Sequence, residues 1–184
     1  MKKLMKYILK MKLKIKVKVL VKGCMPVISD KGDWIDLRAA QEMEIKAAQS
    51  GVQYQENNKK YRDVVTPVVY IPLGVAMQLP KGFEAIVASR SGGPKKLGVF
   101  IPNGQGIIDN SYCGNNDQWY YVASPLKDGF IEKGSRICQF RIQLSQKATM
   151  WQKLKWLFSS GIELIEVDNL ENESRGGLGS SGLK

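Results

Sequence analysis

Short apolar or alternating runs, each closed by turn residues, follow one another from residue 23 to residue 144. The turns include Gly92-Gly93-Pro94, Asn103-Gly104 and Lys133-Gly134. This punctuation predicts several short strands, so the expected fold is all-β, a barrel or a sandwich. With 184 residues, the chain is long enough for one domain with a sizeable core. The predicted strands cover residues 34–39, 64–71, 83–89, 98–101, 119–123 and 137–144.

The positive charge is concentrated at the amino-terminal end. The formal net charge is +11; nine lysines fall within residues 1–22, which hold no acidic residue, and the rest is nearly neutral. Between Leu13 and Val21 apolar residues alternate with lysines, which predicts a strand with one buried and one wet face. Lysines protect a terminal edge strand from other chains, and this explains the charge better than a nucleic-acid or anionic-membrane patch.

Several classes of protein are excluded or disfavoured by composition. Histidine is absent, which excludes Ser-His catalysis and histidine-ligated metals. Cys24, Cys113 and Cys138 form no CxxC pair, so neither a zinc site nor a disulfide framework is predicted. No apolar stretch resembles a signal peptide or approaches the ~20 residues that span a bilayer. We expect a cytoplasmic protein without membrane contact.

Two segments interrupt the strand pattern. Residues 47–63 are polar and predict an exposed loop or excursion. Residues 147–158 predict the one short amphipathic helix. We expect this helix to cover the end of a sheet, although a basic amphipathic helix can also contact a membrane or a partner. Its apolar side consists of Met150, Trp151, Leu154, Leu157 and Phe158.

The chain divides into a β domain over residues 1–167 and a tail over residues 168–184. The tail turns acidic and then ends in RGGLGSSGLK. This composition is typical of a disordered terminus. It also has what a phosphate clamp needs, because glycines let backbone amides close on an anion while Arg175 and the serines add contacts.

Four further stretches place polar groups beside predicted strands. GDWIDLRAA contains Asp36, and Arg90 begins RSGG after a predicted strand. NGQGIIDNSYCG is hairpin-like and presents Asp109, and KGSRICQ ends with Gln139. With the tail, in this order, they resemble the five motifs of the trimeric dUTPase family over about residues 12 to 184. The first of these motifs, GDWIDLRAA, is similar to that of dUTPases from Gram-positive bacteria and their phages.

The resemblance implies a jelly-roll-like subunit, a homotrimer with active sites between subunits, and Mg²⁺-dependent hydrolysis of dUTP to dUMP and pyrophosphate. By family analogy, Asp109 activates the water that attacks the α-phosphorus. Asp36 lies near the metal's water shell or in the site's hydrogen-bond network, and Arg90 contacts phosphate or braces the carboxylates. The phosphates and waters hold most of the Mg²⁺, so no protein ligand is assigned.

The resemblance also implies the substrate contacts. The backbone around Asn103, Gly106 and Ile108 pairs with the uracil edge, and Tyr112 lies under the deoxyribose and excludes a 2′-hydroxyl. The implied phosphate and arm contacts are Ser91, Gly92, Gln139, Arg175, Gly177, Leu178, Gly179, Ser180 and Ser181.

Two residues depart from the family pattern. Trp34 occupies a place where many members have glycine, and Leu178 replaces the phenylalanine that stacks on uracil. We hypothesise that Tyr120, in the run Trp119-Tyr120-Tyr121, supplies the missing ring. The alternative is that these three rings pack in the core or along the trimer axis.

Three alternative functions share part of this sequence pattern. A dCTP deaminase resembles this pattern but needs a glutamate where Trp119 stands. A regulatory protein of the phage dUTPase type would bind a repressor or another protein, most plausibly at residues 47–63 and 147–158. A nucleic-acid-binding barrel needs aromatics among its basic residues, and the amino-terminal lysines have only Tyr7, so no specific nucleic acid is expected.

Overall fold

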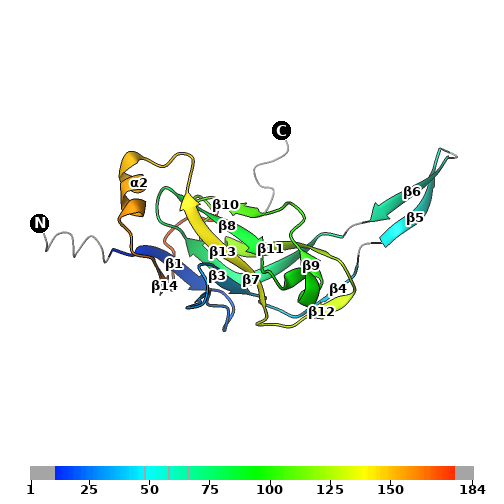
Figure 1. The fold of residues 1–184 in the computed structure, drawn as a ribbon, viewed down its shortest axis with the longest axis horizontal. Coiled ribbons are helices and arrows are strands. Elements are labelled where there is room, and N and C mark those ends of the chain that lie inside the picture. The colour runs from blue at the N-terminus through cyan, green and yellow to red at the C-terminus, as the bar shows by residue number, and fades with distance from the viewer. Residues whose placement is uncertain (1–10, 48, 58, 66, 177–184) are drawn as a thin grey trace, which may run out of the picture.

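Two five-stranded sheets form the body of the protein, and a separate two-stranded hairpin projects from it (Figure 1). The computed structural model describes residues 11–47, 49–57, 59–65 and 67–176. The first sheet has the order β14 (Ile162–Glu166), β1 (Leu13–Val19), β7 (Val69–Gln78), β11 (Gln118–Pro125) and β9 (Val99–Phe100). The second has the order β10 (Gly106–Ile108), β8 (Phe83–Ser89), β13 (Arg136–Leu144), β3 (Ile35–Arg38) and β2 (Val27–Ile28). A smaller pair joins β12 (Gly129–Ile131) to β4 (Met43–Ile45).

The core lies between the two sheets and follows the alternation along each strand. Leu13, Ile15 and Val17 of β1 are fully buried, while the lysines between them face outward or lie at intermediate depth. Trp119 of β11 packs edge-on against Phe140 of β13, with 5.2 Å between ring centroids, and so links the two sheets. The predicted all-β, jelly-roll-like fold is therefore confirmed. Period-two burial on the facing strands produces the one core that the two sheets share.

The position of β1 differs from the prediction. The alternation is confirmed, but β1 is not an edge strand. It pairs antiparallel with β7 on one side and parallel with β14 on the other. Its lysines therefore flank a paired strand, and β14 takes the edge.

The predicted strand over residues 64–71 is wrong, because two strands meet there. The first, β6 (Lys59–Val65), ends before Pro67, and β7 begins at Val69. Proline lacks a backbone donor and restricts the residue before it, so it separates the two strands. Beyond the predicted end, β7 continues to Gln78, and Val75, Ala76 and Met77 are fully buried.

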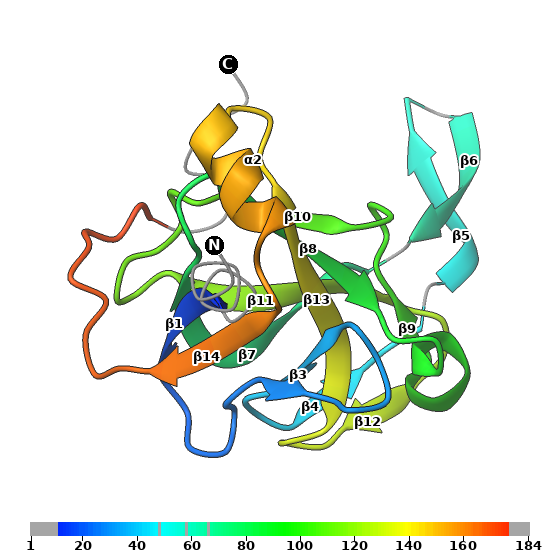
Figure 2. The ribbon, with the colours of Figure 1, turned by 60° about the vertical axis from the view of Figure 1, so that its left-hand side comes forward.

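The predicted loop over residues 47–63 is an antiparallel hairpin instead. It consists of β5 (Gln49–Glu56) and β6, with Glu56 opposite Lys59 at the turn. Asn57 adopts a left-handed conformation with φ of 50°, which asparagine tolerates better than most residues. Figure 2 shows the hairpin standing away from the two sheets, so the segment is an excursion from the body, as predicted, although it is not a loop.

The predicted helix is confirmed as α2 (Met150–Leu157). It begins with a capping box, in which the Thr149 hydroxyl accepts from the Gln152 amide and the Gln152 side chain accepts from the Thr149 amide at 2.7 Å. No helix among the described residues is long and apolar enough to span a membrane.

The predicted packing face of α2 is wrong. Met150, Trp151 and Leu157 are 68%, 80% and 72% exposed. The helix instead contacts the body through Trp156, whose ring centroid lies 5.4 Å from that of Phe83. The 3.6-residue period identifies which residues share a face, but the connection to β13 and β14 determines which face turns inward.

Candidate active site

The first polar cluster is centred on Asp36 of β3, which is only 5% exposed. Its two carboxylate oxygens accept from Arg90 Nε at 2.8 Å and from an Arg136 terminal nitrogen at 3.1 Å. Gln139 of β13 stands opposite Asp36 in the strand register and donates to the carbonyl of Ser89 at 3.3 Å. This ion pair agrees with one of the two predicted roles for Arg90, the bracing of a carboxylate; a contact with phosphate stays a prediction.

A cleft of about 510 Å³ opens beside this cluster. Among the residues that the structure describes, three cations and no carboxylate line it. Such a cleft suits a polyphosphate, because guanidinium and ammonium groups form charge-assisted hydrogen bonds with phosphate oxygens. Its walls contain Arg90, Ser91, Gly92, Gly93, Lys96, Leu97, Ser135 and Arg136.

Sequence reasoning missed two of these cations, Lys96 and Arg136. The sequence could have identified Arg136, since this residue lies in the KGSRICQ stretch that was already singled out. Lys96 comes to the cleft because residues Gly93–Leu97 form a single π-helical turn, in which the Lys96 amide donates to the Gly92 carbonyl at 2.8 Å. A turn of this type leaves no periodic signal in the sequence.

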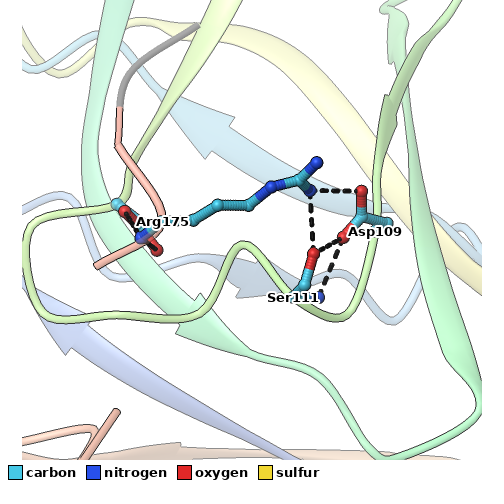
Figure 3. A network of polar contacts seen from close by, with 4 residues as sticks. Asp109, Ser111 and Arg175 are labelled. Carbon is cyan, nitrogen blue, oxygen red and sulfur yellow. Dashed lines mark hydrogen bonds and ion pairs between the residues drawn. The ribbon is translucent and has the colours of Figure 1, made fainter. Parts of the chain in front are cut away.

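The second polar cluster is centred on Asp109, just after β10. Its side chain is 52% exposed. Arg175 reaches from the tail and donates to Asp109 Oδ2 at 2.6 Å and to Ser111 Oγ at 2.8 Å (Figure 3). The Ser111 amide donates to Asp109 Oδ1 at 2.9 Å, and the Ser111 hydroxyl donates to the same oxygen.

These contacts determine the charge state of Asp109. Partial burial raises the pKa of its carboxyl group, but the hydrogen bonds from Ser111 and Arg175 outweigh burial and hold the pKa below its usual value. Asp109 is therefore ionised at neutral pH.

The two clusters lie apart within one chain. Ile108, next to Asp109, pairs with Ala85 near the start of β8, whereas Arg90 follows the other end of that strand. At the usual rise per residue, about 17 Å of strand separates the two levels. A single subunit therefore does not bring Asp109 to the basic cleft.

The predicted hairpin over residues 103–114 is a turn followed by an edge strand. Asn103 lies in the turn, and Gly106–Ile108 form β10, which pairs with β8 on one side only among the described residues. Antiparallel pairing leaves part of the backbone of such a strand free for another partner. The side chain of Asn110 fixes the following turn by donating to the carbonyls of Leu79 and Pro80 at 3.1 and 2.9 Å.

The aromatic residues after Asp109 divide between core and surface. Trp119 and Tyr121 are fully buried, which confirms core packing for these two rings. Tyr120 lies at intermediate depth, where its hydroxyl accepts from the Gln118 side chain at 3.0 Å. The Tyr112 hydroxyl donates to the Gln118 carbonyl at 2.9 Å.

The predicted contacts at Gly177, Leu178, Gly179, Ser180 and Ser181 lie outside the described residues. Within the part that the structure describes, no three His, Cys, Asp or Glu side chains gather at a possible metal site. The cleft's donor set is cationic, so it fits a metal that arrives with phosphate better than a metal held by the protein.

Comparison with known proteins identifies the family. The dUTPase family profile matches residues 60–156. The SPbeta prophage-derived deoxyuridine 5'-triphosphate nucleotidohydrolase of Bacillus subtilis (strain 168) is 43% identical over 155 residues, 84% of this chain and 87% of that protein. The deoxyuridine 5'-triphosphate nucleotidohydrolase of Hydrogenobaculum sp. (strain Y04AAS1) is 36% identical over 63% of this chain and 72% of its own length.

Solved structures show the same fold. The Streptococcus mutans dUTPase aligns with a TM-score of 0.55 at 21% identity, over 70% of this chain and 91% of that chain. A Staphylococcus bacteriophage 80alpha dUTPase with dUpNHpp aligns with a TM-score of 0.54 at 21% identity, over 92% of this chain and 98% of that chain. Together with the relatives above, these likenesses show that the chain belongs to the dUTPase family.

Proposed function

We propose that this protein hydrolyses dUTP to dUMP and pyrophosphate in the presence of Mg²⁺. The basic cleft carries the proposal, because Arg90, Lys96 and Arg136 line it and together outnumber the single Asp36 carboxylate that braces two of them. The names of the relatives state the same substrate, and the bacteriophage 80alpha enzyme was solved with dUpNHpp.

Asp109 is the proposed general base. Its carboxylate is ionised and half exposed, so a water molecule can reach it, and Ser111 fixes its orientation. It orients and deprotonates the water that attacks the α-phosphorus. Arg175 donates to one of its oxygens, and the more highly charged phosphates of dUTP compete for this guanidinium.

Asp36 has a structural role in this scheme. It holds Arg90 and Arg136 in place, so the wall of the cleft is arranged before substrate arrives. Ser91 and Gly92 line the cleft and bind phosphate, and Gln139 supports the wall through Ser89. Mg²⁺ bound to the triphosphate would neutralise part of its charge.

Selectivity for deoxyuridine comes from β10 and the aromatic residues beside it. The free backbone edge of Gly106–Ile108, with Asn103 before it, pairs with the uracil edge, and a cytosine presents mismatched donors there. Tyr112 excludes a 2′-hydroxyl. Tyr120 is the remaining candidate for the ring that covers uracil, since Trp119 and Tyr121 are buried. The arm, residues 168–184, then closes over the nucleotide.

The separation of the two clusters supports a homotrimer with composite sites. Asp109 of one subunit would serve the basic cleft of another, because about 17 Å of strand keeps them apart in one chain. Light scattering of the purified protein tests the trimer, and a monomer that turns over dUTP at full rate would refute it.

Pyrophosphate release from dUTP, dCTP, dTTP and UTP with Mg²⁺ tests the activity. We expect turnover of dUTP alone and its loss in Asp109→Asn. Equal turnover of dCTP, or full activity of the variant, would contradict the proposal.

Mixed trimers test the composite site. Asp109→Asn and Arg90→Ala are each expected to be inactive alone. Co-refolded subunits regain activity if some sites combine an intact Asp109 with an intact Arg90 from different chains. Lack of recovery in verified mixed trimers would place both residues in one subunit's site.

The deaminase alternative is disfavoured by the packing of Trp119. Its ring is fully buried against Phe140, so this position presents no acid to a nucleotide. Absence of ammonia release from dCTP is the expected result.

A second role, binding of a protein partner, is favoured by one observation. The outward face of α2 exposes Met150, Trp151 and Leu157, and such apolar patches often mark interaction surfaces. Trp151→Gln combined with Leu157→Gln should preserve dUTP turnover while weakening binding to any such partner. Equal partner affinity in the variant would remove α2 from the interface.

A further inference from the structure

The loop over residues 114–117 holds the root of the arm, residues 169–175, through several side-chain and backbone hydrogen bonds. The Asn115 side chain donates to Asn169 Oδ1 at 2.8 Å and accepts from the Leu170 amide at 3.0 Å. The Asn116 amide donates to Ser174 Oγ at 3.1 Å. Leu170 itself is 1% exposed. We call this loop the arm receptor.

Asp117 is the most deeply buried polar residue of the arm receptor, at 1% exposed. Its carboxylate accepts from the Gly114 amide at 2.8 Å, and both of its oxygens accept from the Arg175 amide, at 3.0 and 3.1 Å. A buried carboxylate needs such donors, because an unpaired buried charge costs a large desolvation energy. The arm thus supplies one of the two backbone donors that satisfy Asp117.

Gly114 completes the arm receptor by leaving room for the arm. A Cβ atom at this position would lie 2.5 Å from the Ser174 nitrogen and 2.6 Å from the Glu173 carbonyl oxygen. These are backbone atoms, so they cannot rotate away as a flexible side chain could. The close approach lets the arm pass directly over the loop.

We infer that Asp117 is a positioning residue of the reaction, acting through the arm. It fixes the Arg175 backbone at the point from which the Arg175 side chain reaches Asp109. The root of the arm is therefore held by the same chain segment that carries the base. The inference rests on the proposed dUTP hydrolysis, in which Asp109 is the base.

Asp117→Asn in the full-length protein tests the inference. The NH₂ group of the new side chain would face the Gly114 or the Arg175 backbone N–H, which is itself a donor. Two measurements are made. The first is the rate at which trypsin removes residues 176–184 by cutting after Arg175, followed by intact mass. The second is kcat and KM for dUTP. We expect at least about tenfold faster cleavage and at least about tenfold lower kcat/KM.

Asp128→Asn is the matched control. Asp128 accepts from the Ala47 amide at 2.7 Å in an exposed position, so it has a similar hydrogen bond but no contact with the arm. Both readouts should stay at wild-type values. If Asp117 had only a structural role, its substitution would accelerate cleavage at many sites. A positioning role acting through the arm predicts acceleration at Arg175 alone.

Gly114→Ala is the second variant, in case Asp117→Asn does not fold. It displaces the arm sterically and leaves the carboxylate intact, so it should reproduce both changes. Unchanged cleavage at Arg175 in a folded variant would overturn the inference, and so would faster cleavage with unchanged kcat/KM. Cleavage is measured without nucleotide, so failure of dUTP turnover in the wild type would refute the proposed function without bearing on the hold of the arm receptor on Arg175.

Discussion

Asp36 lies within β3 and Asp109 directly follows β10, both strands of the second sheet, but the surroundings of the two carboxylates are opposite. Asp36 is buried and ion-paired with two arginines from neighbouring segments. Asp109 is half exposed and paired with one arginine from the distant tail. The difference teaches that the first carboxylate organises the wall of the basic cleft, whereas the second stays accessible to water and to a side chain from the tail. Substitutions at each should therefore affect different quantities.

Asp109→Asn should have the largest effect. Loss of the base should lower kcat by about 10³-fold, within the usual range for general-base removal. The thermal midpoint should barely change, because the side chain is half exposed. Single-turnover kinetics and calorimetry measure the two. A large loss of stability would show that Asp109, like Asp36, is structural.

Asp36→Asn should mainly affect stability. It leaves Arg90 and Arg136 without a counter-charge, and we expect the free energy of unfolding to fall by about 2 kcal/mol, less than for a fully buried pair because both arginines are partly exposed. Urea denaturation measures this. Asp33→Asn, on the exposed approach to β3, is the control and should change little.

Arg175→Ala should change the pH dependence of the reaction. The pKa of Asp109 is lowered in part by Arg175, so removing the guanidinium raises it. The base then becomes protonated at a higher pH as acid is added, and the acid limb of the kcat/KM profile moves to higher pH. Exposed Lys95→Ala serves as the control. An unmoved limb would mean that Asp109 is not the group titrating there.

Ser111→Ala should have the smallest effect. Ser111→Ala removes the two hydrogen bonds of the hydroxyl, one to Asp109 and one from Arg175. The backbone amide of residue 111 and the direct Arg175 contact still hold Asp109. We expect kcat to fall about threefold. Ser29→Ala, whose hydroxyl accepts from the Lys31 amide at 3.2 Å, provides a comparable control far from Asp109.

Local patterns predicted much of the fold. The strand over residues 83–89 was located to the residue, and α2 was found from its period, because each signal is contained in a short stretch. The pairing of β1 with β14 was not predictable, since β14 lies about 150 residues away and neither segment contains a sequence signal for the pairing. The prediction of the inward face of α2 was wrong for the same reason, because strands distant in the sequence form the surroundings of this helix.

The site shows the same division. Asp36, Arg90 and Asp109 stood out because motif order marked them. Lys96 depended on an irregular turn. Asp117 belongs to no predicted site, because its partner, the Arg175 amide, lies 58 positions further along. Contacts of this range become visible only in three dimensions.

The pairing of β1 with β14 has a consequence for synthesis on the ribosome. β14 emerges after all the other described strands, so the nascent chain exposes one whole side of β1 until then. Lys12, Lys14, Lys16 and Lys18 would discourage neighbouring nascent chains from adding a strand there by mutual repulsion. Hydrogen exchange on stalled chains should show the β1 amides becoming protected in a second step, when residues 162–166 leave the tunnel.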